Sequence, residues 1–145
     1  MIPQKIIVHH SLTKDSGTVS WGAIRRYHIE QRGWLDVGYH AGVELVENNN
    51  ISYYETLLGR AWDIPGAHTA GQNNNSLGIC FVGNFDIDTP PLAQLQAGAK
   101  LIKYWMSIFR IPFKEIYPHR KFADKTCPGK QFDMNALIDI IKWTQ

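Results

Sequence analysis

The chain is poor in cysteine, carries little net charge and contains no long apolar run. Its two cysteines lie in unlike settings, Cys80 inside an apolar segment and Cys127 in a polar loop, so no disulfide between them is expected and synthesis in a reducing compartment is the simpler interpretation. The net charge of +2 arises from scattered lysines and arginines, which does not indicate a nucleic-acid partner. No apolar run approaches the ~20 residues of a membrane helix, so no membrane insertion is expected.

The amino terminus also lacks the basic, apolar and small-residue regions of a signal peptide, which predicts a protein made in the cytoplasm. Internal repeats and low-complexity tracts are missing. The 145 residues, 44% of them hydrophobic, fit one domain that spans residues 1–145. The aromatic content of 12% suits a packed core as well as a sugar- or peptide-binding groove, and composition does not separate the two.

Hydrophobic periodicity predicts an α/β domain with a mixed central β-sheet flanked by about three α-helices. Strands are expected at residues 6–8, 39–46, 51–55, 76–83 and 116–117. The strand at 76–83 is almost continuously apolar, which favours a central position with Cys80 in the core. Helices are expected over residues 21–31, from an N-cap at Thr89 to residue 109, and from about residue 133 onward.

Local signals mark the ends of these elements. Thr18 or Ser20 would cap the first helix. The asparagines at 48–50 predict a hairpin turn, because Asn tolerates positive φ. The second helix is predicted to have one apolar face, formed by Leu92, Leu95, Ala99, Ile102, Trp105 or Met106, and Phe109.

The chemistry-bearing stretch is the loop 118–129, in which His119 and Cys127 stand eight positions apart before a Pro-Gly pair. A cysteine outside a disulfide framework is a small buried hydrophobe, a nucleophile or a metal ligand, and a nearby histidine favours the last two. His9 and His10 end the first strand, where side chains alternate between faces, so at most one of them joins a common site. The strand pattern leaves open which one.

One of these two histidines together with His119 and Cys127 would form a zinc site with two nitrogens and one sulfur. The fourth tetrahedral position would stay open for water, as a catalytic zinc requires, with the metal lowering the pKa of that water and polarising a carbonyl. A structural zinc needs four protein ligands, and no second cysteine loop supplies one. The pattern therefore favours a catalytic site.

Several short motifs are spaced along nearly the whole chain. They are residues 7–11 (IVHHS), 33–40 (GWLDVGYH), 59–60 (GR), 66–71 (GAHTAG), Asn73, 76–79 (SLGI), 83–85 (GNF), 119–120 (HR) and 125–129 (KTCPG). Together and in this order they resemble the zinc-dependent N-acetylmuramoyl-L-alanine amidases of the type 2 family, relatives of the peptidoglycan recognition proteins, and especially the small phage endolysins among them.

The resemblance implies that His9 is the ligand of the histidine pair, with His119 and Cys127 completing a site for one Zn²⁺ per chain. It places Tyr39 and Lys125 on the two catalytic positions of the family, where each would supply a donor to the oxygen on which negative charge develops. His10 would then face away from the metal.

The resemblance places His68 and Asn73 on positions that line the peptide-binding groove. Each assignment has a simpler competitor: Tyr39 as an ordinary sheet residue, Lys125 as a solvated charge, and His68 as a loop hydrogen-bonding group. His28 and His40 are assigned to packing or surface. The two arginines at 60 and 120 are assigned to structural ion pairs or hydrogen bonds.

The expected function is hydrolysis of the amide that joins the lactyl group of N-acetylmuramic acid to L-alanine in bacterial peptidoglycan, by a monomeric phage or prophage endolysin. The protein would be made in the host cytoplasm and act on the cell wall after release. The alternatives are a non-catalytic peptidoglycan-binding module, against which Cys127 argues, and an amidase that also regulates a polymerase, which no residue pattern supports or excludes.

Overall fold

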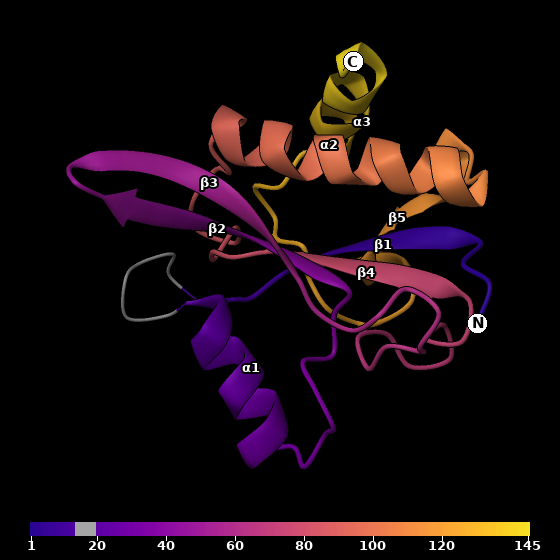
Figure 1. The fold of residues 1–145 in the computed structure, drawn as a ribbon. Helices are drawn as coiled ribbons and strands as arrows, with labels where there is room; N and C mark the ends of the chain where they lie inside the picture. Colours follow the sequence, from indigo (N-terminus) through magenta and orange to yellow (C-terminus); the bar gives the residue numbers. More distant parts are fainter. Residues whose placement is uncertain (14–19) are drawn as a thin grey trace.

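The computed structural model describes residues 1–13 and 20–145, which form one mixed five-stranded β-sheet with helices on both faces (Figure 1). The strands are β1 (Lys5–His10), β2 (Ala41–Asn48), β3 (Ile51–Leu58), β4 (Ser76–Phe81) and β5 (Ile116–Pro118). Their order across the sheet is β3-β2-β4-β1-β5. β2 and β3 pair antiparallel, and the other neighbours pair parallel. The predicted α/β class with a mixed sheet is confirmed.

Three α-helices and two short 3₁₀ helices complete the described chain. They are α1 (Trp21–Glu30), α2 (Leu92–Phe109), η1 (Phe113–Glu115), η2 (His119–Lys121) and α3 (Met134–Trp143). Figure 1 shows α2 and α3 stacked on one face of the sheet and α1 on the opposite face. Within the described residues, no helix has the length and apolar character needed to cross a lipid bilayer.

Most predicted element ends agree with the structure to within a few residues, because their local signals are satisfied. Ser20 caps α1 by accepting from the backbone N–H of Ala23, whereas Thr18, the other predicted cap, lies outside the described residues. The β2–β3 hairpin turns at Asn49 and Asn50, whose φ values are +50° and +63°. β2 has the predicted length but lies two residues further along the chain, whereas β3 is longer than predicted, since pairing continues from the turn to Leu58.

The start of α2 differs from the prediction. The N-cap residue is Pro91 rather than Thr89, and no side chain caps the helix. α2 begins two residues later than a Thr89 cap implies, and Leu92 in its first turn is 61% exposed and does not belong to the buried face. That face is instead formed by Gln94, Leu95, Gly98, Ala99, Ile102 and Trp105.

The two faces of the sheet carry side chains of very different size. The face under α2 and α3 holds the main apolar core, which includes Ile6, Val8, Ala41, Val43, Leu77, Ile79, Phe81 and Ile116. The alternating positions point to the α1 face, and several of them are small: Gly42, Ser76, Gly78 and Cys80. A Cβ on Gly42 would lie 2.3 Å from the Trp21 ring. The α1 face therefore has room for large rings.

Candidate metal centre and cleft

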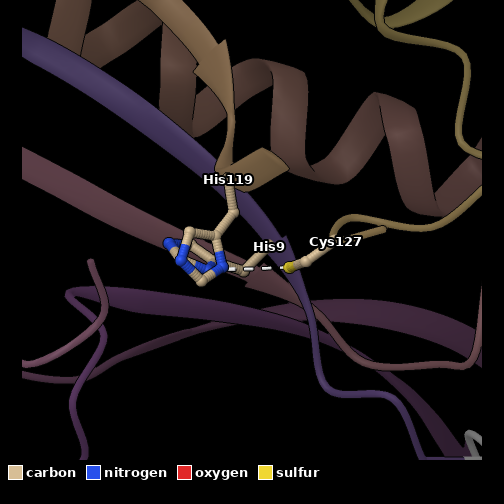
Figure 2. Close-up of side chains that lie close together, drawn as sticks. All are labelled: His9, His119 and Cys127. Atoms are coloured by element: carbon tan, nitrogen blue, oxygen red, sulfur yellow. Dashed lines mark hydrogen bonds between the residues drawn. The ribbon is translucent and has the colours of Figure 1, made fainter. Parts of the chain in front are cut away.

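His9, His119 and Cys127 converge on one point at the carboxyl ends of β1 and β5. Val8 pairs with Pro118 in parallel strands, so the residues that follow them, His9 and His119, lie side by side. Their ring centroids are 4.4 Å apart. Figure 2 shows the Cys127 side chain reaching the same point from the loop that follows η2. The loop thus turns back so that both of its predicted ligands face the end of β1.

The donor atoms of these three residues suit a small metal ion. One ligand atom from each lies within 4.8 Å of the others, and His9 Nδ1 is 3.7 Å from Cys127 Sγ. Around a tetrahedral zinc, a nitrogen and a sulfur ligand are about 3.6 Å apart. All three side chains are buried. Two imidazoles and one thiol in this arrangement form a candidate metal-binding cluster.

Burial sets the protonation states of the cluster in the absence of a metal. Desolvation lowers the pKa of His119 to about 4, and the Lys125 charge adds to the effect. Desolvation also holds the pKa of His9 well below its ordinary value, followed by the influence of His68. Both imidazoles are therefore neutral at pH 7, the form that binds a metal. Burial raises the pKa of the Cys127 thiol to about 11, so this ligand must lose a proton on binding.

The second ring nitrogen of His9 is held by residues of the loop between β3 and β4. His9 Nε2 lies 3.0 Å from His68 Nδ1 and 3.4 Å from Thr69 Oγ1. The His68 ring is buried between two glycines, because a Cβ on Gly66 or on Gly78 would come within 2.5 to 2.8 Å of ring atoms. Such a partner on the outer nitrogen fixes the orientation of a metal-binding imidazole and leaves Nδ1 facing Cys127.

His10, expected to face away from the metal, and His40, expected in packing or at the surface, both have structural hydrogen bonds. His10 Nδ1 accepts from the backbone N–H of Phe85 at 3.1 Å, so its acceptor nitrogen does not face the cluster. His40 is fully buried: its Nδ1 accepts from the N–H of Gly78, and its Nε2 lies 2.9 Å from the carbonyl oxygen of Ile64. His40 thereby ties the loop that carries His68 to the sheet.

The two arginines of the quoted motifs also have structural roles. Arg60 donates to the main-chain carbonyls of Val37 and Pro65, at 2.9 and 2.8 Å. Arg120 donates from Nη1 to the carbonyl of Gly129 at 3.3 Å. Of the two predicted kinds of contact, both arginines make hydrogen bonds, and neither has an ion pair within residues 1–13 and 20–145. Each guanidinium fixes a loop that borders the candidate cluster.

Tyr39 and Lys125 flank the candidate cluster. The Tyr39 ring centroid lies 5.1 Å from that of His9. Burial, followed by the nearby thiols of Cys80 and Cys127, raises the pKa of Tyr39 well above its ordinary value, so its hydroxyl keeps its proton at neutral pH. Lys125 is exposed, two residues before Cys127 on the loop that follows η2, here called the ligand loop (residues 122–130). The Tyr39 side chain is hydrogen-bonded with that of Cys80, and both Tyr39 and Lys125 line the space beside the cluster.

A cleft of about 740 Å³ opens over the cluster. All seven residues predicted for the site line it: His9, Tyr39, His68, Asn73, His119, Lys125 and Cys127. Asn73 is partly committed, since its Oδ1 accepts from the backbone N–H groups of His68 and Thr69. Among the described residues that line the cleft, Arg32 and Lys125 carry charge and none is acidic. The cleft is therefore suited to a substrate that bears carboxylates.

Two polar residues with contacts near the cluster escaped prediction. Thr69, whose Oγ1 is 3.0 Å from His68 Nδ1, lies inside a quoted motif, but a threonine in a loop gives no signal of its own. Asp86 follows the quoted segment 83–85 and binds the ligand loop at Thr126 and Lys130. An aspartate in a turn is too common for its partner to be read from the sequence.

A mixed α/β sheet with a buried two-histidine, one-cysteine cluster beside an open cleft is an arrangement typical of metal-dependent enzymes, hydrolases among them, because three protein ligands leave room for substrate. Within that class, the chain belongs to the N-acetylmuramoyl-L-alanine amidase family (Amidase_2), whose model matches residues 1–130. The predicted family and enzyme class are thereby confirmed.

Individual relatives and solved structures agree with this assignment. The chain is 36% identical over 150 residues to an endolysin of Enterobacteria phage T3, covering 93% of this chain and 89% of the relative. It is 32% identical over 144 residues to peptidoglycan-recognition protein SC2 of Drosophila simulans, covering 95% and 72%. Among solved structures, the N-acetylmuramoyl-L-alanine amidase LysC from Clostridium intestinale superposes with a TM-score of 0.79 at 25% identity, covering 97% of this chain and 86% of that one.

Proposed function

We propose that this protein hydrolyses the amide between the lactyl group of N-acetylmuramic acid and L-alanine in bacterial peptidoglycan, as a phage or prophage endolysin. The observation that carries the proposal is the convergence of His9, His119 and Cys127 at the floor of the cleft in a chain of the amidase family. The absence of acidic side chains from the described cleft lining supports a substrate with carboxylates, as stem peptides have.

His9, His119 and Cys127 would hold one Zn²⁺ per chain, and their donor types and separations fit that ion. When bound, zinc supplies a Lewis acid that polarises the amide carbonyl and activates water. The protein contributes neutral imidazoles, whose pKa values burial keeps low. It also contributes His68, which orients His9 through the hydrogen bond to Nε2.

In this proposal Tyr39 and Lys125 stabilise the negative charge that develops on the amide oxygen. The raised pKa of Tyr39 keeps its hydroxyl a donor throughout the neutral range. Lys125 extends into the cleft from the loop that carries Cys127, so its place relative to the cluster is set by that loop. Both side chains line the cleft in the absence of substrate, which supports donors that need little reorganisation as the charge develops.

The groove contacts are assigned to His68 and Asn73. Both residues line the cleft. The Oδ1 of Asn73 is engaged by the loop, so its side-chain NH₂ group is the part available to a stem-peptide carbonyl. His68 is buried against His9, and its contribution to the groove is the surface of its ring.

The proposal extends to residues 1–145 as one catalytic domain that acts as a monomer on peptidoglycan. The sheet, both helix layers and the cleft belong to a single fold. The protein would be made in the host cytoplasm and reach the wall on release. Light scattering of the purified chain at assay concentration checks the monomer, and fractionation of producing cells before lysis checks the location.

The experiment that tests the function combines metal analysis with product mass. Purified sacculi are incubated with the zinc-loaded chain, and the soluble products are identified by mass spectrometry. We expect free stem peptides that begin with L-alanine among the products. Metal analysis should find one zinc per chain. His9→Ala and Cys127→Ser should each release far less. Parental rates from both folded variants would refute the proposal, and sacculi that bind the protein without releasing peptide would identify a non-catalytic module.

A further inference from the structure

One side chain holds both ends of the short segment that contains Cys127. Asp86, in the turn after β4, accepts from Thr126 Oγ1 on its Oδ2 at 2.8 Å. Its Oδ1 accepts from the backbone N–H of Lys130 at 3.0 Å. Thr126 precedes Cys127 directly, and Lys130 stands three residues after it. The Asp86 carboxylate therefore bridges the loop on either side of the candidate ligand.

The backbone next to Asp86 reinforces this contact. The carbonyl of Phe85 accepts from the N–H of Gln131 at 2.7 Å. Gly129 packs directly on the same peptide: a Cβ there would lie 2.3 Å from the Phe85 carbonyl carbon, and its φ of +120° favours glycine. At Gly129 the backbone of the ligand loop thus lies directly against that of the turn. A displacement of either segment would therefore move the other.

The same turn is joined to the strand that carries His9. The N–H of Phe85 donates to His10 Nδ1 at 3.1 Å, and the backbone N–H of His10 donates to Cys127 Sγ at 3.4 Å. The turn thus contacts the end of β1 and the ligand loop together. The hydrogen bond from Thr126, followed by that from the Lys130 N–H, lowers the pKa of the Asp86 carboxyl, so its acceptor form persists at neutral pH.

We propose that Asp86 is a positioning residue for Cys127, which fixes the thiol at the place where it meets His9 and His119 before a metal binds. This inference rests on the proposed zinc site. A ligand held in place loses less conformational freedom on binding, so a metal is held more tightly than by a free loop. Asp86 does not line the cleft, and its effect on substrate is therefore indirect.

The test compares Asp86→Ala with the matched control Asp88→Ala in the full chain. Asp88 is exposed, lies two residues further along the same turn, and makes no side-chain hydrogen bond within the described part of the chain. Zinc affinity and zinc release are measured by competition with a chromogenic chelator. Asp86→Ala should weaken zinc binding by about 10- to 100-fold, the usual effect of removing a group that supports a ligand. The control should match the parent.

Two further readouts separate positioning from a general loss of structure. With Co²⁺ in place of zinc, the thiolate-to-metal absorption band should weaken or shift in Asp86→Ala, whereas loss of stability alone would leave the band of the folded fraction unchanged. Saturating zinc should restore most of the turnover. Asp86→Asn keeps an oxygen for the Lys130 N–H, so its loss of affinity should be smaller.

Each outcome decides the inference. Parental zinc affinity and an unchanged cobalt band in folded Asp86→Ala would overturn it. If that variant does not fold, Asp86→Asn and Thr126→Val are measured instead: several-fold weaker zinc binding in both supports the bridge, and parental affinity in both refutes it. A parental protein that binds no zinc would refute the proposed function itself, which is a separate result.

Discussion

Zinc binding at pH 6 should release about one proton per chain, and Cys127 should supply it. Burial raises the pKa of this thiol to about 11, so almost every molecule carries the thiol proton before the metal binds. Zinc binds the thiolate, so this proton must leave on binding. His119, with a pKa of about 4, is protonated in only about one molecule in a hundred at pH 6. Because the pKa of His9 is also lowered, His9 releases fewer protons on zinc binding than an ordinary histidine would.

The same pKa values determine how the zinc affinity changes with pH. Zinc must displace the thiol proton, so its apparent affinity should rise about tenfold per pH unit, or ~1.4 kcal/mol, between about pH 5 and pH 7. Below the His119 pKa of about 4, a second proton competes and the loss with acid becomes steeper. Both groups act in the same direction: acid weakens binding.

Isothermal titration calorimetry in buffers of different ionisation enthalpy counts the protons. Working at pH 6 limits the contribution of water beside the metal, which loses a proton only near pH 7. His119→Ala should still release about one proton, and Cys127→Ala should bind zinc more weakly and release close to none. Release of two or more protons by the parent would show that the imidazoles are charged before binding. Release near zero would show an ionised thiol, and either result would refute the reasoning from burial.

Three further outcomes are expected. Lys125→Ala should lower the rate of stem-peptide release by about a hundredfold or more with unchanged zinc content, measured with purified sacculi. Gly78→Ala should weaken zinc binding in chelator competition, because its Cβ would lie within 2.6 to 2.8 Å of His68 ring atoms, whereas Gly22→Ala, which meets nothing closer than 3.7 Å, should not. Leu137→Ala, at a fully buried position of α3, should lower the free energy of unfolding by about 2–5 kcal/mol in denaturant titrations while zinc stoichiometry is retained.

Local signals in the sequence were sufficient for the elements and for most of their ends. The asparagine pair at 49–50 specifies the hairpin turn because both residues adopt positive φ. Asp133 caps α3 through the N–H groups of Asn135 and Ala136, as a helix starting near that residue predicts. The Thr89 cap failed because two prolines follow it, and the chain stays extended through Pro91 before the helix begins.

The loop from His119 to Cys127 was recognisable from the sequence as a source of two soft ligands, because histidine and cysteine eight residues apart are chemically distinctive. Strand alternation also required that only one of His9 and His10 face a common site. Neither pattern shows which of the two histidines faces the site, because that depends on which side of the sheet α2 and α3 cover. In the folded chain those helices cover the side of Ile6 and Val8, which leaves His9 on the opposite side.

The surroundings of the candidate ligands were decided by tertiary structure alone. Gly78 on β4 makes space for the His68 ring, and Asp86 meets Thr126 across 40 positions of sequence. Such contacts join segments that no local pattern relates, because they depend on strand order and on how closely two backbones approach. The sequence by itself determined the elements and the chemistry of the candidate ligands. The fold decided which histidine meets Cys127 and what holds both in place.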